Sequence, residues 1–209
     1  DGTRLAVMGG SRGSEAALMI GARYGVRAVI ATAASGLRWS SVYDPDVAAW
    51  SEDGVPLPYM PTSPAAMPEV VTLEDGTTAY RTTPQFVTSI ADADPAALEA
   101  ATISAELSDG AVLLLGGADD GVWPACQMAQ ITLDRLTASG HASTHADALH
   151  CFPAAGHVGI TPGWPTADTG VVHLGSYAFI TGGTPEGNHD ATRAGLDALR
   201  AFLASELSP

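Results

Sequence analysis

A serine stands at the tip of a glycine-rich turn close to the first residue of the 209-residue chain. Residues 9–13 read Gly-Gly-Ser-Arg-Gly and fit G-x-S-x-G, the pattern of a nucleophile at a sharp strand-to-helix turn. Such a turn lifts the serine hydroxyl out of the sheet and aims the first backbone N–H groups of the helix at a reacting carbonyl. Ser11 is therefore a candidate nucleophile, and the backbone N–H of Arg12 is a candidate oxyanion donor.

A serine nucleophile needs a base, and the chain offers an acid and a histidine in the order Ser, Asp, His. Asp119 and Asp120 follow one apolar segment of strand type, and His157 follows the next. Open α/β sheets place their sites at the C-terminal ends of such strands. We expect His157 to take the proton of Ser11, with an aspartate stabilising the imidazolium. Adjacent residues of extended backbone point opposite ways, so only one of the two aspartates faces His157.

The elements that must position these residues alternate along the chain. We expect strands over residues 4–9, 26–35, 110–117 and 146–153, and helices over residues 11–24, 95–103, 124–139 and 185–207. The first strand, helix and strand make a βαβ unit with a right-handed crossover. The whole alternation predicts an α/β fold with a mostly parallel sheet flanked by helices.

Residues 36–95 have a different character, with many Pro, Gly, Asp and Ser residues. We expect a long excursion that carries short helices and serves as a lid or binding loop. The alternative is a surface insertion packed by its own aromatic residues. Trp39, Trp50 and Tyr59 in the excursion, and Trp123 beyond it, either line a substrate pocket or form the core of the lid. Trp39 and Trp123 are kept as candidates for substrate contact.

The chain is strongly acidic, with a net charge of −14, and all nine basic residues are arginines. The absence of lysine excludes a Schiff-base mechanism, and the acidity argues against nucleic acid as a partner. The composition is typical of a high-G+C bacterial gene or of a salt-adapted protein. Arg12, beside the candidate nucleophile, is the best candidate to bind a substrate anion; the alternative is a surface arginine at a helix start.

Other features of the sequence indicate where the protein is found and which cofactors it needs. No apolar run is long enough to span a bilayer, and no targeting segment is recognisable, so we expect a cytoplasmic protein without a membrane partner. Cys126 and Cys151 match no metal motif and no disulfide framework, and are interpreted as buried small hydrophobes. No metal or cofactor is expected.

Several segments resemble a known family. They are "LAVMGGSRGSEAALMIGARYGVRAVIATAASG", "GVPLPYMP", "LLLGGADDGVWP", "FPAAGHVGITP" and "GGTPEGNHDATRAGLDALRAFLASEL". Together they resemble the C-terminal domain shared by acyl-CoA thioesterases and bile acid-CoA:amino acid N-acyltransferase, an α/β-hydrolase family. The resemblance covers most of the chain and is weakest over residues 61–100. It implies that Ser11 is the nucleophile, Asp120 the acid and His157 the base.

The same resemblance implies a reaction. Amino-acid-conjugating members of the family tend to carry cysteine at the elbow, whereas thioesterases carry serine, so Ser11 implies hydrolysis rather than transfer. We therefore expect a serine acyl hydrolase that acts on a thioester or ester through an acyl-enzyme. The alternatives are an acyltransferase that passes the acyl group to an amine or alcohol, and a non-catalytic hydrolase-like subunit.

The family's hydrolase domain begins several strands before the nucleophile strand. We therefore expect residues 1–209 to be the C-terminal portion of one α/β-hydrolase domain whose earlier strands come from an N-terminal segment or a second subunit. Without those strands, the apolar strand at residues 4–9 would expose an unpaired edge. The second oxyanion donor, which normally follows an earlier strand, would also lie outside this chain.

Overall fold

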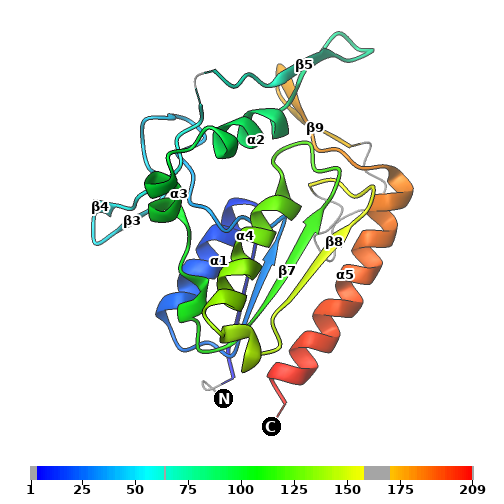
Figure 1. Cartoon of the computed structure of the whole chain (residues 1–209). Coiled ribbons are helices and arrows are strands. Elements are labelled where there is room, and N and C mark those ends of the chain that lie inside the picture. Colours follow the sequence, from blue (N-terminus) through cyan, green and yellow to red (C-terminus); the bar gives the residue numbers. More distant parts are fainter. Residues whose placement is uncertain (1–3, 64, 158–169, 209) are drawn as a thin grey trace.

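The computed structural model describes residues 4–63, 65–157 and 170–208, and it has the α/β architecture expected from the sequence (Figure 1). The parallel sheet and its helices comprise β1 (Ala6–Gly10), α1 (Arg12–Arg23), β2 (Ala28–Thr32), β7 (Ala111–Gly117), α4 (Ala125–Ala138), β8 (Ala148–Phe152) and α5 (Pro185–Glu206). The other elements are β3 (Ser51–Glu52), β4 (Val55–Pro56), β5 (Glu69–Thr72), β6 (Thr78–Arg81), α2 (Thr83–Ala91), α3 (Pro95–Ala101), β9 (Val171–Leu174) and β10 (Tyr177–Ile180), with single 3-10 turns at Ala105–Leu107 and His141–Ser143.

The central sheet has the strand order β1-β2-β7-β8, and every neighbouring pair is parallel. Alternate residues of its strands face opposite layers. Val29 packs with residues of α1 and α4, whereas Ile30 packs with Phe202 of α5. Figure 1 shows the same three layers, with α1 and α4 on one face and α5 on the other. Because the strands are parallel, their C-terminal ends meet at one edge, where the connecting loops converge.

Strand β1 lies at one edge of this sheet and pairs only with β2 among the described residues. The apolar side chains of and next to this strand are unusually exposed: Leu5, just before it, is 52% exposed, and Met8 is 45% exposed. Strand β7, by contrast, is buried along its whole length. The sequence of β1 fits an interior strand, but its exposed side chains and free edge are those of a boundary.

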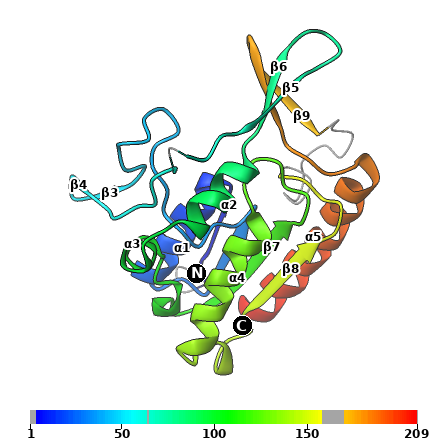
Figure 2. The same ribbon diagram turned by 45° about the horizontal axis from the view of Figure 1, so that its top comes forward.

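The excursion differs from the expectation of short helices. Besides α2 it carries the small β3–β4 hairpin and the antiparallel pair β5–β6. Strand β6 pairs in parallel with β10, and β9 completes a second sheet of order β5-β6-β10-β9. This sheet projects beyond the central layers (Figure 2). Four-residue strands give weak sequence signals, and the β6–β10 pair that joins the two hairpins connects segments about a hundred residues apart, so sequence periodicity did not reveal this sheet.

The interpretation of the cysteines was wrong. Cys126 at the start of α4 and Cys151 on β8 form a disulfide, with Cα atoms 5.6 Å apart. Cys151 is exposed and Cys126 half-buried, so neither is a core hydrophobe. Two cysteines that are 25 residues apart carry no pairing signal of their own, whereas the fold brings α4 beside β8. Disulfides persist mainly in oxidising compartments, and the cytoplasmic location expected from the sequence stays a prediction. None of the helices in the described part of the chain is long and apolar enough to cross a bilayer.

The disulfide should contribute measurably to stability. Closing a loop of 25 residues restricts the unfolded chain, and loss of that restriction is expected to lower the free energy of unfolding by about 3 kcal/mol. In a domain of this size the melting temperature would fall by about 10 °C. Thermal unfolding of the Cys126→Ser/Cys151→Ser double variant, with and without reductant, measures the effect. Alkylation of both thiols in protein that has not been reduced would contradict the bond.

Candidate active site

Ser11 occupies a constrained turn between β1 and α1. Its backbone has φ 55° and ψ −127°, a conformation that side-chain-bearing residues rarely adopt. Its N–H donates to the carbonyl of Thr32 at the end of β2, at 2.9 Å. A Cβ added to Gly9 would collide with the carbonyl of Gly13, so strand and helix approach closely only because residue 9 is glycine. A Cβ added to Gly13 would meet no neighbour within 4 Å, so this second glycine of the motif is not needed for packing.

The structure brings Ser11, His157 and Asp120 together in a line. His157 Nε2 lies 2.8 Å from Ser11 Oγ, and His157 Nδ1 lies 2.8 Å from Asp120 Oδ2. Both the histidine and the aspartate are more than 90% buried. A carboxylate accepts the Nδ1–H proton of the imidazole, which leaves Nε2 free to accept the serine hydroxyl. This is the hydrogen-bond order that activates a hydroxyl nucleophile.

The two adjacent aspartates point in opposite directions, as expected. Asp120 turns inward: its second oxygen, Oδ1, accepts the backbone N–H groups of Val122 at 2.8 Å and Trp123 at 3.1 Å. Asp119 turns outward, where it pairs with Arg81 and accepts the Gly183 N–H at 2.9 Å. Asp120 is therefore the carboxylate that faces His157, and its own loop holds it in position.

The segment "GGTPEGN" (residues 182–188) fixes the loop that carries His157. The His157 N–H donates to the carbonyl of Thr181 at 2.8 Å, and the Gly156 N–H donates to the buried side chain of Asn188 at 2.8 Å. Gly183 has φ 76°, and a Cβ there would collide with Asn188 and with the backbone of Gly156. This segment is recognisable in the sequence only through family resemblance. The role of Asn188 was not predicted, because nothing in its spacing links it to His157. Residues 158–162 of the "FPAAGHVGITP" segment lie outside the described residues.

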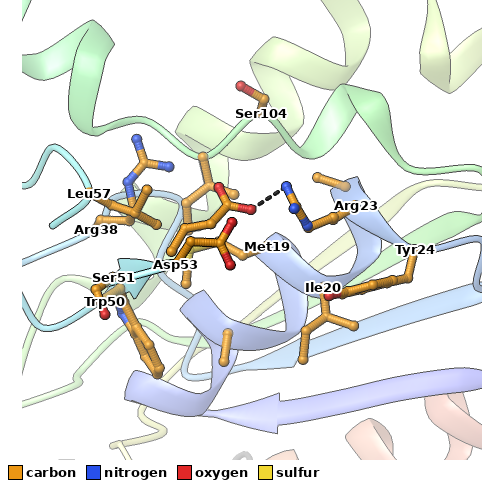
Figure 3. Close-up of a pocket in the computed structure, with 14 residues that line it drawn as sticks. Met19, Ile20, Arg23, Tyr24, Arg38, Trp50, Ser51, Asp53, Leu57 and Ser104 are labelled. Atoms are coloured by element: carbon orange, nitrogen blue, oxygen red, sulfur yellow. Dashed lines mark ion pairs between the residues drawn. The ribbon is translucent and has the colours of Figure 1, made fainter. Parts of the chain in front are cut away.

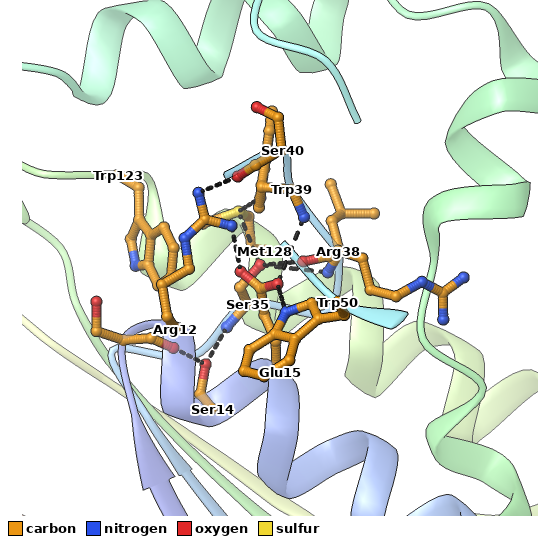
Figure 4. A network of polar contacts seen from close by, with 12 residues as sticks. Arg12, Ser14, Glu15, Ser35, Arg38, Trp39, Ser40, Trp50, Trp123 and Met128 are labelled. Atoms are coloured by element: carbon orange, nitrogen blue, oxygen red, sulfur yellow. Dashed lines mark hydrogen bonds and ion pairs between the residues drawn. The ribbon is translucent and has the colours of Figure 1, made fainter. Parts of the chain in front are cut away.

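The side chain of Arg12 joins a polar network beside Ser11 (Figure 4). Arg12 Nη1 pairs with Glu15 Oε1 at 3.0 Å, and Nη2 donates to the carbonyl of Ser40 at 2.8 Å. Glu15 Oε2 also accepts the Trp50 indole N–H at 2.6 Å and the Trp39 backbone N–H at 3.4 Å. The network therefore joins the first turn of α1 to the excursion.

Glu15 was missed by the sequence analysis, although its position three residues after Arg12 is a helical pairing distance. It is fully buried. Burial raises the pKa of Glu15 to about 7, and the charge of Arg12 with the donated hydrogen bonds offsets only part of that effect. A buried carboxyl that titrates near neutral pH next to a candidate nucleophile is typical of a functional region.

The candidate pocket tryptophans are core residues. Trp39 is 1% exposed, and its indole N–H contacts the sulfur of Met128 at 3.3 Å. Trp123 is 2% exposed and donates to the carbonyl of Ala33 at 3.1 Å. Its ring also meets the His157 imidazole edge-on, with centroids 5.4 Å apart. Trp39 and Trp123 therefore shape the site from inside the core rather than line an open pocket.

A cavity of about 560 Å³ lies between α1 and the β3–β4 hairpin (Figure 3). Its lining includes Met19, Ile20, Tyr24, Trp50 and Leu57. None of Ser11, Asp120 and His157 lines it, so this cavity is separate from the reacting groups. Trp50 connects the cavity to the polar network of Arg12 and Glu15, because it lines the cavity and its indole N–H donates to Glu15. Among the described residues, no group of three or more His, Cys, Asp or Glu side chains could hold a metal ion.

Comparison with known proteins identified a family and, among the solved structures, a similar peptidase. The family described as "BAAT / Acyl-CoA thioester hydrolase C terminal" matches residues 1–209. The structure is similar to that of a Mycobacterium tuberculosis puromycin-hydrolyzing peptidase, with a TM-score of 0.48 and 15% sequence identity; the match covers 100% of this chain and 22% of that one. The chain therefore spans less than a quarter of the peptidase's length. A comparison with curated proteins gave no match.

The two glycines of the turn should respond differently to alanine. Gly9→Ala forces strand and helix apart, so we expect a loss of stability of at least about 2 kcal/mol and displacement of Ser11. Gly13→Ala meets no neighbour and lies within α1, so it should be neutral or should stabilise by up to about 1 kcal/mol. Urea unfolding of the two variants gives the comparison. Equal destabilisation by both substitutions would contradict the elbow geometry.

Proposed function

The chain belongs to the BAAT / acyl-CoA thioester hydrolase C-terminal family, and on that premise we propose that it is a serine acyl hydrolase acting on thioester or ester bonds. The observation that carries the proposal is the 2.8 Å contact between Ser11 Oγ and His157 Nε2, continued to Asp120 at 2.8 Å. An isolated polar pair has many structural uses. A serine in a strained turn, followed by a histidine and a carboxylate held in one line, is an arrangement that serves nucleophilic catalysis.

The proposed reaction proceeds through an acyl-enzyme. Ser11 Oγ attacks the substrate carbonyl while His157 Nε2 takes its proton, and the Asp120 carboxylate stabilises the imidazolium. The tetrahedral intermediate places negative charge on the former carbonyl oxygen. His157 then gives its proton to the departing thiolate or alkoxide. In the second half of the reaction, water gives a proton to His157 and attacks the carbonyl of the acyl-enzyme. His157 then returns this proton to Ser11 Oγ as the acid leaves, which restores the Ser11 hydroxyl.

The oxyanion is stabilised in part by the N-terminus of α1. Arg12 is the first residue of this helix, so its backbone N–H has no helical carbonyl four residues earlier to bind. The helix dipole adds partial positive charge at the same end. One oxyanion donor typically contributes about 100-fold or more in rate, so this N–H would be an important part of the site.

Hydrolytic activity should fall when any of the side chains of Ser11, His157 and Asp120 is changed. We expect Ser11→Ala, His157→Gln and Asp120→Asn each to reduce acyl-thioester hydrolysis by about 10³-fold or more in the protein's native assembly. A fluorophosphonate should label the wild-type protein and not Ser11→Ala. Analysis of the products formed with and without an added amine distinguishes hydrolysis from acyl transfer.

Two exposed residues supply matched controls. Ser205→Ala and His189→Gln remove the same side-chain types away from the site and should leave hydrolysis unchanged. Labelling at a residue other than Ser11, or full activity in His157→Gln, would overturn the proposal. Absence of any adduct in a folded native assembly would favour a non-catalytic binding subunit instead.

We also propose that a further polypeptide segment pairs with β1. The strand reads Ala-Val-Met-Gly-Gly and has none of the charged residues or prolines that protect natural sheet edges. The half-exposed Leu5 and Met8 provide apolar surface for such a segment. An additional strand would also bring a loop to the Ser11 end of the sheet, where a second oxyanion donor is needed.

The segment is either an earlier part of the same polypeptide or a separate subunit, and its presence can be measured directly. Protein purified from its natural cells is compared by denaturing and native mass measurement. We expect a longer chain or a second polypeptide that stays bound until the protein unfolds. A single monomeric species of 21.3 kDa with full activity would contradict this proposal.

A further inference from the structure

Glu15 is a fully buried carboxyl that the reaction described above does not use. It lies on α1, one helical turn beyond Ser11, and its two oxygens accept from three segments of the chain. Oε1 meets the Arg12 guanidinium at 3.0 Å, and Oε2 meets the Trp50 indole at 2.6 Å and the Trp39 backbone at 3.4 Å (Figure 4). Such complete coordination holds both the carboxyl and the donors around it in fixed positions.

Stability alone does not explain this arrangement. Burial outweighs the favourable effect of Arg12 and of the donated hydrogen bonds, so the pKa of Glu15 rises to about 7 and its ionised form is disfavoured. Buried ion pairs of this kind often contribute less to stability than apolar side chains of the same volume would. What the pair does provide is a fixed direction for the Arg12 guanidinium.

That direction places the guanidinium on the side of α1 where Trp123 lies, one residue along the chain from Ser11. Arg12 directly follows Ser11, and its guanidinium carbon lies 5.8 Å from the centre of the Trp123 ring, which itself contacts His157. A guanidinium has five N–H donors, and the bonds to Glu15 and the Ser40 carbonyl use two of them. A quarter of the side chain remains exposed, so a ligand above Ser11 can reach it.

We propose that Glu15 is a positioning residue that holds the Arg12 guanidinium beside Ser11, where it binds an anionic group of the acyl substrate. The substrate class is an acyl ester or thioester with a carboxylate or phosphate near the scissile carbonyl. This inference rests on the proposed function, because it requires Ser11 to be the nucleophile. Glu15 acts through Arg12 and does not touch the reacting atoms.

An anionic substrate of this protein would need such a local cation. With a net charge of −14, the protein repels an approaching anion at long range. Arg38 is not an equivalent alternative, because it lines the separate cavity, which none of Ser11, Asp120 and His157 lines. Arg12 combines the required charge with proximity to Ser11, and a guanidinium suits planar recognition of carboxylate or phosphate oxygens.

The test compares covalent labelling of Ser11 by matched fluorophosphonates in the native assembly. One probe ends in a carboxylate, the second carries the methyl ester of the same chain, and the third ends in a phosphate monoester to distinguish the two anions. The readout is the ratio of second-order labelling rates, anionic to neutral probe. This ratio cancels a general loss of reactivity, which a purely structural role for Glu15 would produce.

We expect the wild-type protein to prefer at least one anionic probe by about tenfold, the effect of one charge-assisted contact. Arg12→Gln should bring the ratio close to one, and Glu15→Gln should lower it at least threefold, because Arg12 remains but is no longer held. Glu99→Gln, which removes a carboxylate from the surface ion pair with Arg135, is the matched control and should keep the wild-type ratio.

Each other outcome has a definite meaning. A wild-type ratio near one, or a wild-type ratio in Glu15→Gln, overturns the inference while leaving the nucleophile in place. Failure of all probes to label Ser11 overturns the proposed function and this inference with it. If Glu15→Gln does not fold, Trp50→Phe replaces it: loss of the indole N–H donor should lower the ratio by about twofold, and an unchanged ratio would contradict the coupling.

Discussion

The strained backbone of Ser11 is the constraint on which the rest of the site depends. A residue with a side chain keeps a positive φ only where its surroundings impose it. Here the end of β2 does so: Thr32 accepts the Ser11 N–H, and the buried Ser14 hydroxyl joins the Ser11 carbonyl, at 2.6 Å, to the N–H of Ser35, at 3.0 Å. The strand next to β1 therefore holds the turn from both sides, and Gly9 lets α1 come close enough for this to happen.

The other two residues of the line are held in position by backbone groups of the surrounding loops. Asp120 lies in a loop whose backbone N–H groups donate to its second carboxylate oxygen. The backbone N–H of His157 donates to the carbonyl of Thr181. The glycines at the start of "GGTPEGN" allow the approach, because a Cβ at Gly182 or Gly183 would collide with neighbouring loops. Separate loops thus reach one point at the end of the sheet because their backbones approach closely, which the glycines at these positions allow.

The sequence predicted the part of the fold whose signals are local. The apolar runs of β2 and β7, the stripe of α5 and the glycine turn at Ser11 all follow from periodicity over a few residues, and the order Ser, Asp, His follows from the loops after the strands. What it did not predict depends on pairing across long separations. The β6–β10 pair, the Cys126–Cys151 bond and the contact of Trp50 with Glu15 each join segments that only the folded chain brings together. The burial of Trp39 was missed for the same reason, since its partner Met128 lies 89 residues away.

The site is divided between two sources. Ser11, His157 and Asp120 follow the ends of the central strands, whereas the partners of Arg12 and Glu15 come from the excursion, at Ser40, Trp39 and Trp50. The excursion also holds the loop of Asp120 directly, because Thr83 Oγ1 donates to the Asp120 carbonyl at 2.5 Å and the Thr82 N–H donates to the Gly121 carbonyl at 2.9 Å. A change in the excursion can therefore move both the Arg12 guanidinium and the carboxylate that faces His157. In such a scaffold the sheet fixes the serine turn, whereas one long insertion contacts both the Arg12 guanidinium and the loop of Asp120.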